Sequence, residues 1–287
     1  MQKTKLIGIM WFVMSLVISC LNDVLTKKLG QRLPSFEVVF FRFLFSTISL
    51  LPFIMFYGFK SLGSINPKLH FFRGLFLFVA IAFWCKALET TPIMTVTTMS
   101  FTIPFFVLPM ARIFLGEKLN TARVIATITG FVGILIVTSP KNIGGIGSAT
   151  YYLVAGAMLF ASLDIINKKI SLEETMLSML FYSAIVTTVL SSVPAMKVWV
   201  APEITELFWC FLLGCGANLI LYCLLKAFKY IEVSAISPFR YLELILSSIF
   251  GYLIFNDKIT MNLLIGAVII ILSSLALSYF ETKEKLN

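Results

Sequence analysis

The chain has 287 residues, of which 59% are hydrophobic and 13% are charged, and its net charge is +9 at pH 7. Soluble proteins average about 45–50% apolar and 25% charged residues, so this composition excludes an ordinary soluble domain. The sequence has one histidine, His70, and five cysteines whose spacing does not match a metal site. These residues do not favour a metal site or a Ser-His-Asp triad. We therefore expect a membrane protein with no metal and no cofactor that is not an enzyme.

Apolar runs long enough to cross a bilayer follow one another along the chain. A transmembrane helix needs about 20 mostly apolar residues, and continuously apolar runs favour helices over the alternating strands of a membrane barrel. The opening MQKTK precedes an apolar run that lacks a small-residue cleavage site, so the first run is interpreted as a membrane helix and not as a signal peptide. The sequence predicts ten transmembrane helices, at 6–25, 36–57, 70–89, 93–115, 121–138, 149–167, 175–196, 205–225, 233–255 and 259–280.

The basic residues predict the orientation of these helices. Fourteen of the 23 Lys and Arg residues fall on the side that would hold both termini, and six fall on the other side. Because connections on the cytoplasmic side carry the excess of Lys and Arg, both termini are predicted to be cytoplasmic. The positive net charge is then explained by orientation and by the lipid bilayer as partner, and no nucleic acid is expected to bind.

The two halves of the sequence repeat. A shift of 141 residues aligns Asp23–Lys28 (DVLTKK) with Asp164–Lys169 (DIINKK), and a shift of 140 aligns Leu115–Leu119 (LGEKL) with Phe255–Ile259 (FNDKI). A duplicated unit of five helices must enter the membrane from opposite sides in its two copies. We therefore predict a single membrane domain, 1–287, built from a five-helix repeat at 6–138 and an inverted one at 149–280, as in many secondary transporters.

Some charges within the predicted helices break this symmetry. Glu243 is the eleventh residue of the predicted helix 233–255, near the bilayer centre, and Arg240 lies on the same face three residues earlier. An ionisable group inside the membrane is a functional-site hypothesis, although Arg240 and Glu243 could instead neutralise each other. The charges that only one repeat carries are Glu37, Arg42, Arg240 and Glu243, which align with Ser178, Ser183, Ser100 and Ile103.

Other candidates are either symmetric or uncharged. Asp23 and Asp164 are aligned mates, as are Lys86 and Lys226, so a gating or structural role is predicted for these four. Aromatic and amide side chains near the symmetry-breaking charges could contact a substrate, with packing in the core as the alternative for each. These candidates are Phe41, Trp84, Phe101, Tyr182, Asn218 and Tyr241.

Several motifs resemble a known family. The FFRFL of Phe40–Leu44 and the acid-lysine pairs after the fourth and ninth predicted helices resemble the drug/metabolite transporter superfamily, EamA branch. LDIINKK at 163–169, LLKAF at 224–228 and RYLEL at 240–244 are similar to the S-adenosylmethionine uptake transporters of obligate intracellular bacteria such as rickettsiae. One departure is Phe239, where that family leads us to expect Tyr.

The resemblance implies a function and a set of roles. It implies a carrier in the bacterial inner membrane, a monomer or weak dimer, that takes up S-adenosylmethionine by alternating access, driven by the membrane potential or by exchange with S-adenosylhomocysteine. Glu243 would bind the cationic groups, Arg240 or Arg42 the carboxylate, and aromatic faces the adenine and the sulfonium. The alternative is an exporter of amino acids or related metabolites, proton-coupled through Glu243 or Glu37. An intramembrane enzyme or a purely structural subunit has no positive feature in its favour.

Overall fold

The computed structural model describes residues 2–64, 66–88, 99–138, 148–255 and 261–283, and every regular element in these ranges is a helix. Seven of the helical segments are long and apolar enough to cross a membrane, and three shorter apolar helices accompany them. The prediction of an all-helical membrane protein is thus confirmed for the described part. Predicted features outside the described ranges are the end of the third span at 89, the start of the fourth span at 93–98, the start of the tenth span at 259–260, and the Asp257-Lys258 pair.

The helices follow one another in two sets of similar order. The first set is α1 (Gln2–Leu29), α2 (Ser35–Tyr57), the 3-10 turn η1 (Phe59–Leu62), α3 (Pro67–Leu88), α5 (Ile103–Leu115) and α6 (Thr121–Thr138). The second set is α7 (Ser148–Ile170), α8 (Met176–Lys197), α9 (Ile204–Tyr230), α10 (Val233–Ile236), the 3-10 helix η3 (Ser237–Tyr241), α11 (Leu242–Phe255) and α12 (Met261–Lys283).

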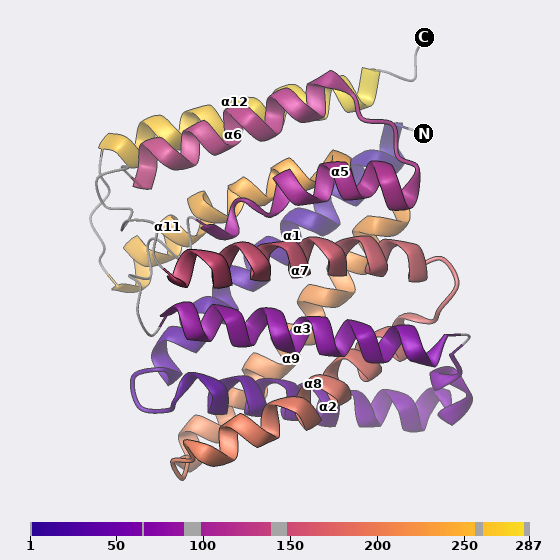
Figure 1. Ribbon diagram of the computed structural model, residues 1–287, viewed down its shortest axis with the longest axis vertical. Coiled ribbons are helices and arrows are strands. Elements are labelled where there is room, and N and C mark those ends of the chain that lie inside the picture. Colours follow the sequence, from indigo (N-terminus) through magenta and orange to yellow (C-terminus); the bar gives the residue numbers. More distant parts are fainter. Residues whose placement is uncertain (1, 65, 89–98, 139–147, 256–260, 284–287) are drawn as a thin grey trace.

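Helices from the two sets pack against each other along a common direction (Figure 1). α1 packs on α9 and α3 packs on α7, while α2 contacts both α8 and α9, and α3 also contacts α8. α6 lies along α12, α1 contacts α11, and α5 contacts α7. α1 begins and α12 ends at the same end of the bundle, which we call the terminal end (Figure 1).

The structure corrects the prediction of one continuous helix at 233–255. The segment is divided into α10, η3 and α11, with the 3-10 turn at Ser237–Tyr241. Pro238 explains the break, since it has no N–H to donate to the carbonyl one turn earlier. The aligned segment of the first set is also interrupted, because α5 begins at Ile103 only after a turn at 101–102.

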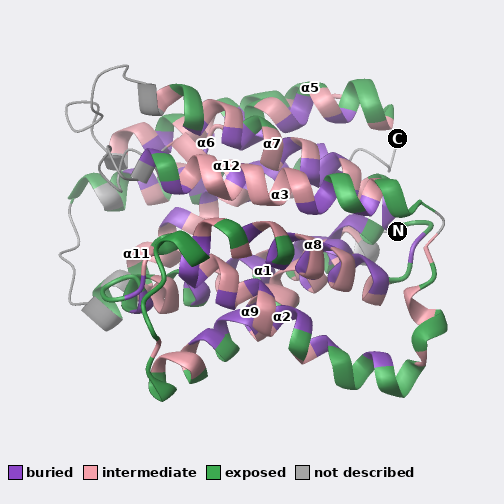
Figure 2. Cartoon of the chain, turned by 60° about the horizontal axis from the view of Figure 1, so that its bottom comes forward, coloured by how far each residue is buried: buried purple, intermediate pink, exposed green. Residues whose placement is uncertain are grey.

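The outward faces of the helices are apolar. Figure 2 shows that buried residues gather where helices meet and that the outer faces are exposed or intermediate. Exposed side chains on these faces include Met55 (78% exposed), Phe56 (83%) and Ile113 (73%). Water-soluble monomers rarely expose extended apolar surface, so these faces suit contact with lipid chains.

Close approach of two helices depends on Gly214 of α9. A Cβ atom at this position would lie 2.6 Å from the backbone nitrogen of Ser46 on α2 and 2.8 Å from the carbonyl carbon of Phe45. Both are backbone atoms, which cannot rotate away. Glycine therefore sets the α2–α9 distance, as small residues do in membrane helix packing.

We predict that Gly214→Ala destabilises the protein by about 1–3 kcal/mol, the range for overpacking a filled interior. Thermal unfolding of the purified protein in detergent measures the effect. Gly156→Ala on α7 is the matched control, because its Cβ would meet Ala80 only at 3.6 Å, an ordinary contact. Equal unfolding temperatures for the two variants would contradict the prediction.

Candidate functional site

The broken segment positions Arg240 against α7. Its Nη2 donates a hydrogen bond to Oδ2 of Asp164 at 2.6 Å, and the two side chains are 20% and 9% exposed. Arg240 is therefore paired directly with Asp164, and its direct ion-pair partner among the described residues is not Glu243. Glu243 interacts with Arg240 only as a neighbouring charge.

Glu243, at the start of α11, faces α1. Its Oε1 accepts a hydrogen bond from the Ser19 hydroxyl at 2.9 Å, and its carbonyl oxygen lies 3.7 Å from the sulfur of Cys20. Asp23 lies one helical turn beyond Ser19 on the same face of α1, where it interacts electrostatically with Glu243 and with Arg42 of α2. Five charged side chains thus meet between the helices, and we call them the central cluster: Asp23, Arg42, Asp164, Arg240 and Glu243.

Several buried polar atoms beside this cluster have no protein partner. A 3-10 helix has three residues per turn, so Ser237, Arg240 and Glu243 share one face. Among the described residues, the Ser237 hydroxyl, the Nε atoms of Arg240 and Arg42, and the Tyr241 hydroxyl form no hydrogen bond. Buried polar groups are normally satisfied, so this face is suited to a polar ligand or to water.

The central cluster is not fully covered by other side chains. Asp23 is exposed by surface area. Its neighbours, Arg42 of α2 and Glu243 of α11, are partly buried. A charge in hydrocarbon is costly, whereas one on a hydrated opening is not. The cluster therefore has the exposure expected of a small-molecule site within the bundle.

One of the predicted aromatic residues, Trp84, contacts a neighbour of the cluster. Phe101 and Tyr241, whose ring centres lie 6.2 Å apart, are 2% and 1% exposed within an apolar cluster that includes Ile134 and Ile270. Trp84 packs edge-on against Phe160, which lies one turn before Asp164 on α7. Phe239 is buried in the main apolar core and lies off the face that carries Ser237 and Arg240, so its departure from the expected Tyr leaves that face unchanged.

Other predicted residues lie elsewhere. Phe41 packs on Trp199 at a centroid distance of 5.5 Å, and Glu37 accepts a hydrogen bond from the backbone of Val200, both at the end opposite the termini. Asn218 is bonded to Ser46 and so joins α9 to α2. The structure does not bring these three into the central cluster.

Tyr182 and the two aligned lysines are also separate from it. The Tyr182 hydroxyl donates to the carbonyl of Leu62 at 3.0 Å, at the terminal end. Lys226 lies 5.7 Å from the ring of Tyr222, and Lys86 is an exposed residue near the end of α3.

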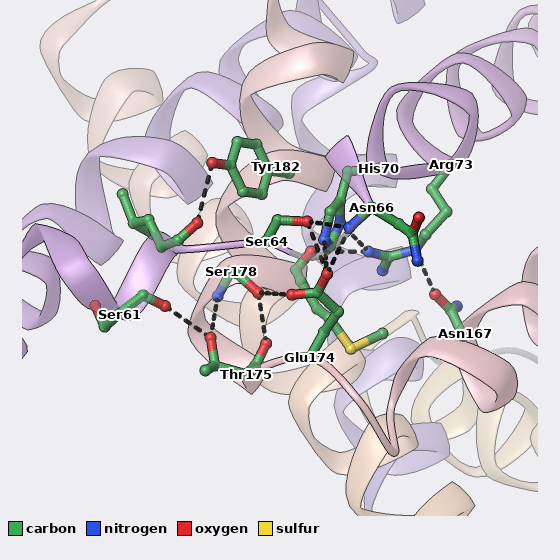
Figure 3. A network of polar contacts seen from close by, with 12 residues as sticks. Ser61, Ser64, Asn66, His70, Arg73, Asn167, Glu174, Thr175, Ser178 and Tyr182 are labelled. Carbon is green, nitrogen blue, oxygen red and sulfur yellow. Dashed lines mark hydrogen bonds and ion pairs between the residues drawn. The ribbon is translucent and has the colours of Figure 1, made fainter. Parts of the chain in front are cut away.

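A buried polar network that the sequence reasoning missed lies at the terminal end (Figure 3). Arg73 is 1% exposed and donates to Asn167 on α7 at 2.8 Å, while its Nη1 lies 3.0 Å from His70. The Glu174 carboxylate accepts from Ser64 at 2.7 Å and lies 3.6 Å from His70 Nε2. The spacing of His70 and Arg73, one turn apart on an apolar helix, is the signal that could have revealed it.

A second set of missed contacts joins the loop after α5 and the start of α6 to the start of α10 at the same end. Glu117, after α5, accepts hydrogen bonds from the backbone nitrogens of Val233 and Ser234, at 2.9 and 3.0 Å, and from the Ser234 hydroxyl. Arg123 of α6 forms an ion pair with Glu232 and donates to Ser234. We call these contacts the terminal latch.

A multi-pass helical bundle with a broken span and a charged cluster at its centre has the architecture of a membrane transport protein. The EamA-like transporter family model matches the chain twice, at residues 6–139 and 147–279. The chain belongs to the EamA-like transporter family, and it is a transporter of small molecules and not an enzyme.

Individual relatives agree with this assignment. The chain is 48% identical to an S-adenosylmethionine uptake transporter of Rickettsia bellii, over 98% of this chain and 96% of that protein. It is 46% identical, with the same two coverages, to one from Rickettsia prowazekii, and 30% identical to a riboflavin transporter of Brucella anthropi over 89% and 92%. A crystal structure of another protein, 17% identical, superposes with a TM-score of 0.81 over 99% of each chain, so the fold is shared.

We predict that Asp164→Asn and Arg240→Met each lower the stability by about 1–3 kcal/mol, because each leaves the other charge without its partner. The double variant should lose less than the sum of the two, and thermal unfolding in detergent measures all three. Glu203→Gln, in an exposed pair with Arg32, is the control and should change stability by at most about 1 kcal/mol. Additive losses would show that the pair contributes nothing.

Proposed function

We propose that the protein takes up S-adenosylmethionine across the bacterial inner membrane by alternating access. The observation that carries this proposal is the charge of the central cluster. It contains three carboxylates and two guanidinium groups, so its formal charges sum to −1. A cluster of that charge within a membrane favours a substrate of net charge +1.

S-adenosylmethionine has that net charge at neutral pH, from a sulfonium, an ammonium and a carboxylate. Arg240, whose Nε is free of protein partners, can donate to the carboxylate. Glu243 lies one turn away on the same face and can accept from the ammonium. Trp84, which is half-buried beside Phe160, is the predicted aromatic residue whose ring we propose for the adenine.

The relatives support the same substrate. Two uptake transporters whose names specify S-adenosylmethionine share nearly half their residues with this chain over almost their full lengths. Riboflavin transporters are more distant relatives. Both are bulky compounds that contain a nitrogen heterocycle, so a large aromatic-binding site is consistent with both.

We further propose that the chain crosses the membrane ten times, as two inverted five-helix repeats with both termini in the cytoplasm. The family model matches each half once, which supports a duplication. The helix contacts also fall into pairs under the shift of 140–141 residues: α1 with α9 against α7 with α3, and α2 with α9 against α8 with α3. α1 begins and α12 ends at the same end of the bundle, as expected for an even number of membrane spans.

Alternating access requires one end of the bundle to be closed while the other is open. The polar contacts at the terminal end are buried, with Glu117 8%, Arg123 4% and Glu174 7% exposed. Asp23, in the half of α1 farther from the terminal end, is exposed. We infer that the structure is the outward-facing state, in which the central cluster is reached from the side opposite the termini.

The membrane potential can drive uptake without a coupling ion. One positive charge that moves inward across about 100 mV gains roughly 2.3 kcal/mol, which is enough for nearly fifty-fold accumulation. Exchange with S-adenosylhomocysteine remains compatible with the same site.

We predict that Glu243→Gln reduces uptake of labelled S-adenosylmethionine at least about tenfold, because it removes one unit of counter-charge from the central cluster. Proteoliposomes with an imposed inside-negative potential measure the uptake. Glu173→Gln, on an exposed turn at the terminal end, is the matched control for an acid that lies outside the site. An exporter of amino acids would instead show no saturable S-adenosylmethionine uptake with the wild-type protein and would respond to a pH gradient.

We predict that Glu117→Ala opens the terminal end. In a cysteine-free background, the buried Ala235 is replaced by Cys, and its labelling by a membrane-impermeant maleimide is followed from the terminal side. The variant should label several-fold faster, because three hydrogen bonds to the start of α10 are lost. Glu173→Ala should label like the parent, and unchanged labelling in Glu117→Ala would remove the terminal latch from the gating mechanism.

A further inference from the structure

Two aligned aspartates have opposite surroundings. Asp164 of α7 is bonded to Arg240 at 2.6 Å. Asp23 of α1, its mate under the 141-residue shift, forms no hydrogen bond or ion pair with any other residue in the described part of the chain. Arg240 therefore neutralises Asp164, whereas Asp23 has no such ion-pair partner.

The sequence explains the difference. The residue that aligns with Arg240 in the first half is Ser100, which carries no charge, so Asp23 has no equivalent of the arginine that holds Asp164. Arg42 is near enough to interact with Asp23 electrostatically but does not form an ion pair with it. A symmetric structural role, which the alignment predicted for both aspartates, accounts for Asp164 alone.

The surroundings of Asp23 are those of a ligand site. It is exposed and stands one turn from Ser19, whose hydroxyl binds Glu243. On η3, Ser237 is 3% exposed and its hydroxyl has no partner, on the face that also carries Arg240. Unsatisfied carboxylate and donor groups on the elements around Glu243 point to a ligand with both positive and polar groups.

The substrate's own geometry separates the roles of Asp23 and Glu243. The ammonium and carboxylate of an amino acid are bound to one carbon, and Glu243 and Arg240 lie one turn apart on one face, so this pair suits the amino-acid end. The sulfonium is two methylene groups away. Side chains on neighbouring turns of one helix face are about 5–6 Å apart, so Asp23 lies about that far beyond Ser19. This distance matches the separation between the amino-acid end of the substrate and its sulfonium.

We propose that Asp23 is the specificity-determining residue that recognises the positive charge on the substrate's sulfur. This inference rests on the proposed function and deepens it. A sulfonium has no hydrogen to donate, so a carboxylate with no partner of its own can meet it through charge alone. S-adenosylhomocysteine, a neutral thioether, lacks that charge and binds more weakly.

Binding of three ligands to purified protein tests the proposal. The ligands are S-adenosylmethionine, S-adenosylhomocysteine, and the analogue in which an amine-bearing carbon replaces the methylsulfonium and keeps a positive charge there. The wild-type protein should prefer the two cationic ligands over the thioether by about tenfold or more, as expected for one charge pair in a partly solvated site. In Asp23→Asn, affinity for both cationic ligands should fall to near that for the thioether, whose own affinity stays the same.

Matched variants isolate the effect. Asp23→Glu keeps the charge and should keep the preference, and Asp23→Ser is a second neutral variant in case the Asn variant does not fold. Asp164→Asn, the aligned mate, should weaken all three ligands alike because it loosens Arg240. Retained binding of S-adenosylhomocysteine shows that a variant is folded.

Each other outcome overturns the inference. If Asp23→Asn weakens all three ligands equally, or leaves the preference unchanged, Asp23 does not recognise the sulfonium. If the wild-type protein binds the three ligands equally, the inference fails while the proposed function stands. If the wild-type protein binds none of them, the proposed function fails and this inference fails with it.

Discussion

The structure depends on how charge is balanced inside a bundle that sits in lipid. A single unpaired charge in hydrocarbon costs several kcal/mol, so each one needs a partner, water or a ligand. Arg240 and Asp164 satisfy each other directly. The carboxylates left over, Asp23 and Glu243, then require an opening to water and a cation. The broken segment supplies the geometry for both conditions, because the 3-10 turn aligns Ser237 and Arg240 with Glu243.

The two ends of the bundle have different chemistry at equivalent positions. Arg73 and Glu174 form part of the buried polar network at the terminal end. Their aligned counterparts, Leu213 and Leu33, belong to an apolar cluster at the other end. Hydrogen bonds are directional and strong only at short range, whereas apolar contacts tolerate sliding. Closure at the terminal end is therefore more specific than closure at the opposite end.

Much of this could be predicted from the sequence, because lipid imposes simple rules. Long apolar runs predicted the helices, and asymmetric charges predicted Arg240 and Glu243 at a common place. What failed depended on local backbone or on partners distant in sequence. Pro238 broke a helix whose apolar pattern was uninterrupted. The alignment treated Asp23 and Asp164 as equal, although only Asp164 forms an ion pair with an arginine. Phe41 and Tyr182 lie next to Arg42 and Ser183 in the sequence, yet the contacts of their side chains lie away from the central cluster.

The contact between Thr47 of α2 and Thr188 of α8 links residues separated by the repeat shift of 141, with their hydroxyls 3.5 Å apart. Under the proposed symmetry each threonine is the equivalent of the other, so an exchange of the two halves leaves this contact unchanged. If the two halves exchange conformations during transport, contacts between non-equivalent residues are replaced by their counterparts, whereas this one maps onto itself. The threonine pair can thus remain intact through the whole cycle and act as the pivot about which the two halves turn.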